Sequence, residues 1–327
     1  MYRIKLVANP DLSKFAVATI GNFDGLHLGH LELLSKLQQI ATDNNYRKVV
    51  ITFEPLPLEH FADLKFEKRL TRLSLVRDKV IILKQQNLTD ELVILRFNQA
   101  LANLRPKEFI QQILKQQLGV KHVVIGHDFK FGKNGSGTID DFRDYGIKTT
   151  ITPPYYIANE RVSSSLIRHY ATKNELKMVA RYLGHNLHYT SRVVYGNQLG
   201  RKFGVPTINL ALNHNRPALW GIYTAYVHIE GKIYNAVVSI GKNPTVSIQD
   251  IYKLEAHLLD VDLDLYGKIA TIEILSFIRE ERKFDDIDSL FKQIYLDVQN
   301  AKNYFTAKAF INDNCLIDLK LKYKDED

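Results

Sequence analysis

The chain has 327 residues, 45% of them hydrophobic and 24% charged, a balance typical of globular proteins with sizeable cores and a length that predicts two domains. One cysteine, Cys315, excludes an internal disulfide framework and a cysteine-rich zinc site, and it fits a reducing cytoplasm. The net charge is +8, but the basic residues are interspersed with acidic ones. This arrangement favours attraction of small polyanions such as nucleotides over nucleic-acid binding.

No part of the sequence has the features of a targeting or membrane segment. The N-terminal stretch lacks a long apolar core after its basic start, so it does not have the pattern of a signal peptide. No apolar run reaches the roughly 18 residues that a membrane span needs. We therefore expect a cytoplasmic protein without a membrane partner.

The first half of the chain alternates short apolar runs with longer amphipathic segments. Buried strands are predicted at residues 15–21, 48–55, 91–97, 121–129 and 144–152. Helices are predicted at residues 30–44, 72–86, 105–119 and 164–184, with Gly119 and Gly184 as stops. This alternation favours an α/β domain with a parallel, Rossmann-like sheet covered on both faces, whose ligands bind beyond the carboxyl ends of the strands.

The pattern of apolar residues changes near residue 185, so the predicted domains are 1–184 and 185–327. Short alternating runs follow at residues 189–196, 206–212, 221–241, 253–260 and 268–279, and Glu230-Gly231 has the pattern of a hairpin turn. Several such strands without intervening helices predict a small antiparallel β-barrel. A final helix is predicted over residues 286–305.

The stretch from Thr19 to Leu34 holds two histidines, His27 and His30, between a predicted strand and a predicted helix. Glycines in such a turn let the backbone approach a ligand, and the helix start presents free N–H groups to an anion. Two imidazoles one turn apart would face the same anion, which suits the charge that builds on ATP phosphates during attack at the α-phosphorus. The pair alone also allows packing or helix-capping histidines, whereas a metal site lacks an obvious third ligand.

With the glycines around them, the histidines resemble the signature of HxGH nucleotidyltransferases, and the preceding GNFDG is similar to bacterial flavin adenylyltransferases. Nearly the whole chain resembles the bacterial bifunctional riboflavin kinase/FAD synthetases. The further matching segments are ITFEPLP at 51–57, GHDFKFGKNGSGT at 126–138, RVSSSLIR at 161–168, GRKFGVPTIN at 200–209, IGKNPT at 240–245 and LEAHLLDVDLDLYGK at 254–268. Several independent motifs in the correct order are far more specific than any one of them.

For the adenylyltransferase, the resemblance implies that His27 and His30 stabilise the ATP phosphates while the FMN phosphate attacks and pyrophosphate leaves. The turn beneath the nucleotide would be shaped by Gly21, Phe23, Asp24 and Gly29. Phosphates would be held from the opposite side by Ser163, Ser164 and Arg168. Flavin would bind at Asp128, Phe129 and Phe131. From the residues alone, the serines also suit a helix N-cap and the phenylalanines suit a core at a strand end.

One position departs from the family pattern. Leu56 stands where the family usually has histidine in the ITFEPLP segment. If that imidazole binds flavin phosphate or nucleotide in the family, this chain lacks the contact. The departure keeps open the alternative of a riboflavin kinase whose adenylyltransferase half is weakened or lost.

For the kinase, the resemblance implies that Thr207 and Asn209 hold Mg²⁺ against the ATP phosphates, because hydroxyl and amide oxygens are hard ligands. Ile208 replaces the usual alanine between them, and strand alternation predicts that it points away from both ligands. Glu255 would accept the proton of the riboflavin 5′-hydroxyl as that oxygen attacks the γ-phosphorus, although the segment alone also suits an exposed glutamate. The other ATP-binding positions would be Gly196, Gly200, Arg201, Gly204 and Asn243. The glycines among them also suit simple barrel turns.

The sequence thus predicts an enzyme that uses ATP and Mg²⁺ to convert riboflavin to FMN, and then FMN to FAD. Besides the kinase with one working half, a third alternative is a flavin-binding regulator that has lost catalysis and uses its basic surface on RNA. Retention of the motif residues speaks against this last alternative; they are His27, His30, Thr207, Asn209 and Glu255.

Overall fold

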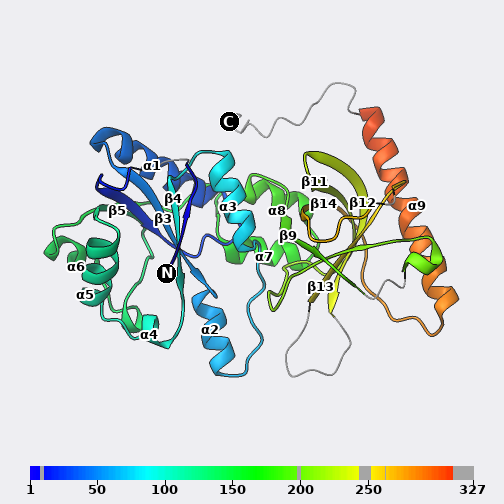
Figure 1. Ribbon diagram of the computed structural model, residues 1–327, viewed down its shortest axis with the longest axis horizontal. Helices are drawn as coiled ribbons and strands as arrows, with labels where there is room; N and C mark the ends of the chain where they lie inside the picture. Colours follow the sequence, from blue (N-terminus) through cyan, green and yellow to red (C-terminus); the bar gives the residue numbers. More distant parts are fainter. Residues whose placement is uncertain (8–10, 197–199, 243–251, 262, 312–327) are drawn as a thin grey trace. The chain divides into compact units, whose positions relative to one another are not determined.

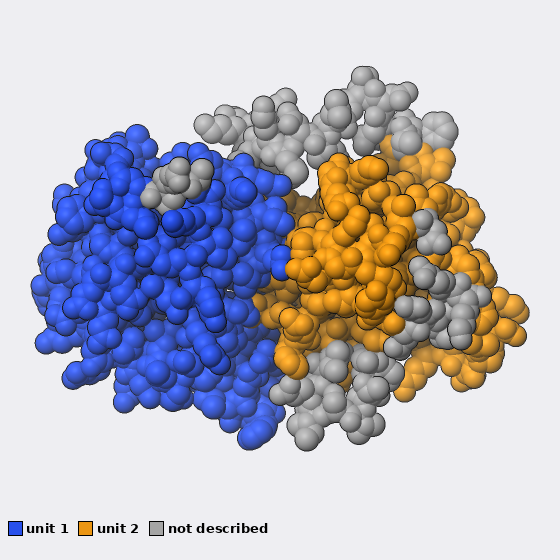
Figure 2. Space-filling model, in the orientation of Figure 1, with its two compact units in different colours: residues 1–70, 76–166 blue, residues 71–75, 167–327 orange. Residues whose placement is uncertain are grey.

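The computed structural model describes residues 1–7, 11–196, 200–242, 252–261 and 263–311. Its packing divides the chain into two compact units, which Figure 2 shows in separate colours. Unit 1 comprises Met1–Leu70 and Val76–Leu166, and unit 2 comprises Thr71–Leu75 and Ile167–Asp327. The predicted functional boundary between residues 184 and 185 stays a prediction, and Cys315 lies outside the described residues.

Unit 1 is built on a six-stranded sheet with the strand order β1-β4-β3-β2-β5-β6. Figure 1 labels its strands β3, β4 and β5. Its strands are β1 (Tyr2–Lys5), β2 (Ala16–Ile20), β3 (Arg47–Glu54), β4 (Glu91–Arg96), β5 (Val120–Gly126) and β6 (Lys148–Thr152). Only β1 pairs antiparallel in this sheet, and β2 to β6 are parallel. The predicted parallel α/β domain is therefore confirmed.

Alternate residues of the central strands enter two separate hydrophobic cores. Val17, Val50 and Leu92 pack with helices α1 (Leu28–Asn44) and α3 (Val76–Gln85). Ala18 and Val49 pack on the opposite face with the π-helix η1 (Phe109–Gln117) and with α6 (Ile139–Asp144). Because helices cover both faces of the sheet, we expect ligands to bind beyond the carboxyl ends of its strands.

Unit 1 also contains short elements that connect these layers. They are α2 (Pro57–Leu64), α4 (Gln99–Ala102), α5 (Pro106–Glu108), the 3₁₀ turn η2 (Lys133–Gly135), and the strands β7 (Tyr156–Ile157) and β8 (Glu160–Arg161). Helix α2 was not expected from the sequence. Proline is favoured in the first turn of a helix, and Pro57 at the start of α2 follows this rule.

The helix predicted from residue 72 begins only at Val76. Residues 71–75 belong instead to unit 2. There the Arg72 N–H donates to the Arg216 carbonyl at 2.7 Å, and Arg72 forms a β-bridge with Pro217. The Tyr189 hydroxyl donates to the Arg72 carbonyl at 3.1 Å. These long-range backbone contacts replace the helical hydrogen bonds that the local pattern predicts.

Unit 2 contains a closed six-stranded barrel with the order β10-β13-β12-β11-β14-β9. Its strands are β9 (His188–Val194), β10 (Ile208–Leu210), β11 (Gly221–Ile229), β12 (Lys232–Lys242), β13 (Tyr252–Leu258) and β14 (Ile269–Arg279). All of its pairings are antiparallel, and β10 closes it by pairing with β9. The predicted barrel and its terminal helix, α9 (Ile287–Ile311), are both confirmed.

Positive backbone φ angles decide two local features of unit 2. The hairpin turn lies at Glu230 (φ 49°) and Gly231 (φ 77°), with Ile229 paired to Lys232, as predicted. The helix predicted over residues 164–184 is broken into α7 (Ser164–Thr172) and α8 (Leu176–Leu183). Asn174 lies at the break with φ 57° and accepts a hydrogen bond from the Tyr223 hydroxyl at 2.6 Å.

A buried ion cluster links three strands of the unit 1 sheet. Glu91 is only 1% exposed and accepts hydrogen bonds from Arg47 Nη1 at 2.9 Å and from Arg3 Nη2 at 2.8 Å. Arg47 is itself 6% exposed, whereas Arg3 is 32% exposed. The pair between Glu91 and Arg47 is therefore shielded from water, and the pair with Arg3 is not.

We expect Glu91→Gln to lower the free energy of unfolding by about 3 kcal/mol, because it removes the counter-charge of a buried arginine. The matched change Arg3→Met should cost less than about 1 kcal/mol, because that pair is partly exposed. Urea denaturation of both variants measures the difference. Equal losses would contradict a special role for the buried pair.

Candidate active sites

The predicted nucleotide turn of unit 1 connects the carboxyl end of β2 to the start of α1. Phe23 and Asp24 are 1% exposed, and Phe23 has a positive φ of 45°. The Gly21 N–H donates to the Ile51 carbonyl at 3.0 Å, and Lys79 Nζ donates to the Asn22 carbonyl at 2.6 Å. The turn is thus held by β3 and α3 at the edge where a parallel sheet binds ligands.

His27 and His30 stack on each other at the start of α1. Their ring centroids are 3.6 Å apart and their planes differ by 17°. His27 is the N-cap, and its Nδ1 accepts a hydrogen bond from the His30 N–H at 3.3 Å. Because Nδ1 accepts, the neutral His27 ring carries its proton on Nε2. The helix-capping role and the predicted anion-binding role are compatible.

The surroundings of His30 oppose its protonation. Burial, the nearby His27 and the nearby Lys79 hold the pKa of His30 well below its usual value. His30 Nδ1 is buried and has no hydrogen-bond partner within the described part of the chain. A bound anion would offset the unfavourable charge and would favour the imidazolium form.

Ser164, in the segment RVSSSLIR, contacts the predicted nucleotide turn although it lies 140 residues after Asp24 in the sequence. Ser164 Oγ donates to the Asp24 carbonyl at 2.9 Å. Ser163 Oγ accepts from the Leu166 N–H at 3.2 Å, which makes Ser163 the cap of α7. Arg168 lies in unit 2, where its Nε donates to the Thr71 carbonyl at 2.7 Å. The phosphate-binding roles of these three residues stay predictions.

The segment predicted to bind flavin contributes to the core of unit 1. Phe131 is 8% exposed and stacks on Phe142 and Phe129 at centroid distances of 4.5 and 5.7 Å. Asp128 is exposed and forms an ion pair with Arg161 at 2.5 Å. The packing that the residues alone suggested is present for Phe131, and the flavin-binding role of Asp128, Phe129 and Phe131 stays a prediction. The family-divergent Leu56 is 3% exposed at the start of α2.

The predicted kinase residues lie in one cross-strand row of the barrel. Asn209 on β10 is opposite Glu255 on β13, and Glu255 is opposite Ser239 on β12. Side chains of residues directly opposite each other share a face of the sheet, and Thr207, two residues before Asn209, shares the same face. Ile208 is 8% exposed on the other face, so its predicted orientation away from Thr207 and Asn209 is confirmed, and the metal-binding role of these two residues stays a prediction.

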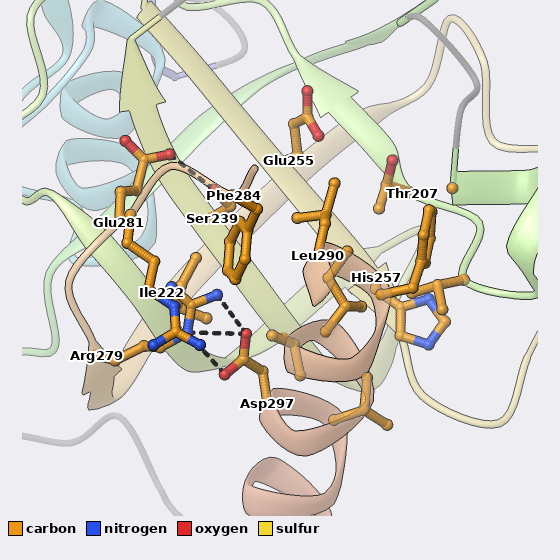
Figure 3. A pocket seen from close by; sticks show the side chains of 17 residues that line it. Thr207, Ile222, Ser239, Glu255, His257, Arg279, Glu281, Phe284, Leu290 and Asp297 are labelled. Carbon is orange, nitrogen blue, oxygen red and sulfur yellow. Dashed lines mark hydrogen bonds and ion pairs between the residues drawn. The ribbon is translucent and has the colours of Figure 1, made fainter. Parts of the chain in front are cut away.

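A cavity of about 280 Å³ lies over this face, beneath α9 (Figure 3). Thr207, Ser239 and Glu255 line it from the barrel. Helix α9 contributes apolar side chains, namely Leu290, Phe291, Ile294 and Val298. A second cavity, of about 410 Å³, shares the walls Val205, His257 and Val298 and is otherwise lined by Gly204, Pro206, Leu258, Asp260, Val261, Tyr295 and Lys302.

Charged side chains fix the far wall of the first cavity. Arg279 donates to the carboxylate of Asp297 on α9 at 2.7 to 3.1 Å, and Asp297 is 2% exposed (Figure 3). Burial raises the pKa of Glu281, which accepts a hydrogen bond from Ser239 Oγ at 3.3 Å. Lys253 Nζ lies 3.6 Å from Glu255. The cavity is therefore lined by apolar side chains from α9 and by carboxylates from both the barrel and α9.

The predicted nucleotide loop of the kinase needs its glycines for close contacts. A Cβ on Gly196 would lie 2.3 Å from Asn209 Nδ2, and a Cβ on Gly200 would lie 2.3 Å from the Val205 carbonyl oxygen. The 3₁₀ turn η3 (Gly200–Phe203) is held by α9, because the Tyr295 hydroxyl donates to the Phe203 carbonyl at 2.8 Å. The side chain of Arg201 and the whole of Asn243 lie outside the described residues.

Two family models match consecutive parts of the chain. The model for FAD synthetase matches residues 10–166, and the model for riboflavin kinase matches residues 183–305. A Haemophilus influenzae protein named bifunctional riboflavin kinase/FMN adenylyltransferase is 35% identical over 88% of this chain and 94% of its own length. The Escherichia coli K12 protein of the same name is 37% identical over 88% of this chain and 92% of its own length.

A crystal structure from Streptococcus pneumoniae, described as a macrolide-efflux protein, aligns with a TM-score of 0.70 at 28% identity. The alignment covers 91% of this chain and 97% of the pneumococcal chain, so the fold is shared across both units. The efflux description applies to the pneumococcal protein. In the part of the chain described here, no helix is long and apolar enough to cross a bilayer.

The two family matches define a nucleotidyltransferase domain followed by a kinase domain. The chain belongs to the family of bifunctional riboflavin kinase/FMN adenylyltransferases. The predicted two-domain enzyme is thereby confirmed, and the presence of both domains does not favour the alternative with one working half.

The lowered pKa of His30 predicts a pH-dependent stability. As the pH falls below about 6.5, the unfolded chain takes up a proton that the folded chain resists, so the free energy of unfolding falls by up to about 1.4 kcal/mol per pH unit. In His30→Gln this contribution is absent, and the pH profile between about 6.5 and 5 should be shallower. Urea denaturation at several pH values measures it, and identical profiles would contradict the assigned cause.

Proposed function

We propose that the chain makes FAD in two ATP-dependent steps. Unit 2 phosphorylates riboflavin to FMN, and unit 1 transfers the adenylyl group of ATP to FMN with release of pyrophosphate. The observation that carries this proposal is the cross-strand row of Asn209, Glu255 and Ser239 beside a cavity, in a chain that also holds the stacked histidines. The family match supports both steps, and riboflavin, FMN, FAD and ATP are the proposed ligands.

In the kinase step, Glu255 accepts the proton of the riboflavin 5′-hydroxyl while that oxygen forms a bond to the γ-phosphorus and ADP leaves. We place the flavin ring in the apolar cavity beneath α9, because Glu255 lines that cavity and not the adjoining one. The nucleotide then occupies the adjoining cavity, which Gly204 and Lys302 line, and it reaches the wall of the flavin cavity at Gly200 and Thr207. Gly196, Gly200, Arg201 and Asn243 complete the proposed nucleotide site.

The residues present fit a magnesium ion in the kinase. Asn209 on β10 and Thr207, directly before that strand, offer neutral hard oxygens, and Gly196 leaves room for the Asn209 amide. When bound, Mg²⁺ offsets the charge of the nucleotide phosphates. Thr207 and Asn209 would hold it, and their strand fixes their spacing from Glu255.

In the adenylyl transfer, a phosphate oxygen of FMN attacks the α-phosphorus of ATP and the bond to the β-phosphate oxygen breaks. His27 and His30 donate hydrogen bonds to the charge that develops on the phosphates. Gly21, Phe23, Asp24 and Gly29 shape the turn, and phosphates bind Ser163, Ser164 and Arg168. The use of ATP in both steps supports a cytoplasmic location. The proposed partners are the small-molecule substrates, and neither a nucleic acid nor a membrane is among them.

Glu255→Gln should leave riboflavin unconverted, with a loss of about 10²–10⁴-fold in kinase turnover, because the general base is removed. Formation of FAD from supplied FMN should remain. Glu230→Gln, the same charge change at an exposed hairpin turn, is the matched control. Product chromatography after incubation with riboflavin, ATP and Mg²⁺ measures both steps.

His30→Ala should stop the reaction at FMN, with a loss of about 10²–10³-fold in adenylyl transfer, because a donor to the developing charge is removed. The exposed His214→Ala serves as the control. The same chromatographic assay separates FMN from FAD. If His30→Ala and Glu255→Gln lost the same step, the proposed division of labour would be wrong.

A further inference from the structure

Lys79 lies in the first turn of α3, and its side chain is only 1% exposed. Two physical effects oppose a cation at this position. Burial removes the ammonium from water, and the start of a helix is the positive end of its dipole. A neutral side chain of similar length, such as methionine, would fill the space without either cost. The ammonium at this position therefore points to a role other than packing.

The ammonium of Lys79 binds the backbone of the predicted nucleotide turn. Its Nζ donates to the Asn22 carbonyl at 2.6 Å and to Thr52 Oγ1 at 3.4 Å. Thr52 lies on β3 and is fully buried, and its hydroxyl donates to the same Asn22 carbonyl at 3.2 Å. One carbonyl of the turn is thus held by a charged donor from α3 and by a neutral donor from β3, all within unit 1.

The backbone that follows this carbonyl has an unfavourable conformation. Phe23 and Leu26 have positive φ angles of 45° and 43°, although neither is a glycine. Such residues persist only where the surrounding contacts determine their conformation. Asn22 directly precedes Phe23, and the peptide unit between them is planar, so hydrogen bonds to the Asn22 carbonyl fix the point at which the strained stretch begins.

The same stretch of backbone carries the aromatic ring that contacts His30. The ring centroids of Phe23 and His30 are 5.1 Å apart, with the planes inclined by 57°. A displacement of Asn22 would therefore move Phe23 and, through this ring contact, the imidazole of His30. Burial, His27 and Lys79 together lower the pKa of His30, so the ammonium is also close enough to act on that imidazole directly.

We infer that Lys79 is a positioning residue of the adenylyl transfer, which holds the nucleotide turn and His30 in place for the phosphates of ATP. This inference rests on the proposed function of unit 1. Lys79 acts through the Asn22 carbonyl and Phe23, and it takes no part in the bond changes at phosphorus. Its fixed positive charge beside the turn also favours the approach of a polyanion.

The test measures steady-state kinetics of FAD formation from FMN and ATP with the full chain. Lys79→Met keeps the length of the side chain and removes its donors and its charge. It should lower kcat by about 10- to 100-fold, because small displacements at a reacting centre have effects of this size. The KM for FMN should stay within about 3-fold of the parent, since the lost contact does not bind the flavin. Lys84→Met, the same change at an exposed position of α3, is the matched control and should leave both constants unchanged.

A second variant, Thr52→Val, removes the neutral donor to the same carbonyl and keeps Lys79. It should lower kcat by about 3- to 10-fold, a smaller loss because a neutral donor is weaker than a charged one. An unchanged kcat in either variant would overturn the inference. So would a lower kcat together with a raised KM for FMN and a lower melting temperature, which would identify Lys79 as a packing residue. If Lys79→Met does not fold, Thr52→Val decides by the same criteria. If the parent chain forms no FAD from FMN and ATP, the proposed function itself fails.

Discussion

Hydrogen-bond register in the closed barrel determines which side chains reach the kinase cavity. Asn209, Glu255 and Ser239 share a face only because their three strands are paired at these positions. A slip of one residue would turn Glu255 inward and bring the buried Ala256 to the cavity. Barrel closure removes the free edges at which such a slip would begin, so the fold itself sets the spacing between Glu255, Asn209 and Ser239.

Unit 1 uses electrostatics in a different way. Two stacked imidazoles and the buried Lys79 lie close together, so protonation of His30 is unfavourable without a ligand. An anion bound at the same place would reverse this balance, and its binding would then be coupled to proton uptake. The site is thus arranged before the substrate arrives, and little reorganisation is needed when charge develops.

Features governed by local chemistry could be predicted from the sequence. The Glu230-Gly231 turn, the stop at Gly184 and the orientation of Ile208 follow from backbone preferences and strand alternation. The family of the chain followed from motifs in order. The residues Thr207, Asn209 and Glu255, which the motifs singled out separately, share one face of the barrel.

Features that depend on distant contacts could not be predicted. The bond from Ser164 to Asp24 joins segments 140 residues apart, and the break at Asn174 is stabilised by Tyr223 from the barrel. The late start of α3 depends on Arg216.

The short segment Thr71–Leu75 limits where the chain can be divided into its two units. It belongs to the barrel unit by its contacts, yet it lies in sequence between two parts of the sheet unit. A single cut in the gene cannot separate the two units cleanly, because the barrel would lose the strand-like bridge between Arg72 and Pro217. The two units are therefore joined by interleaved topology as well as by a peptide linkage.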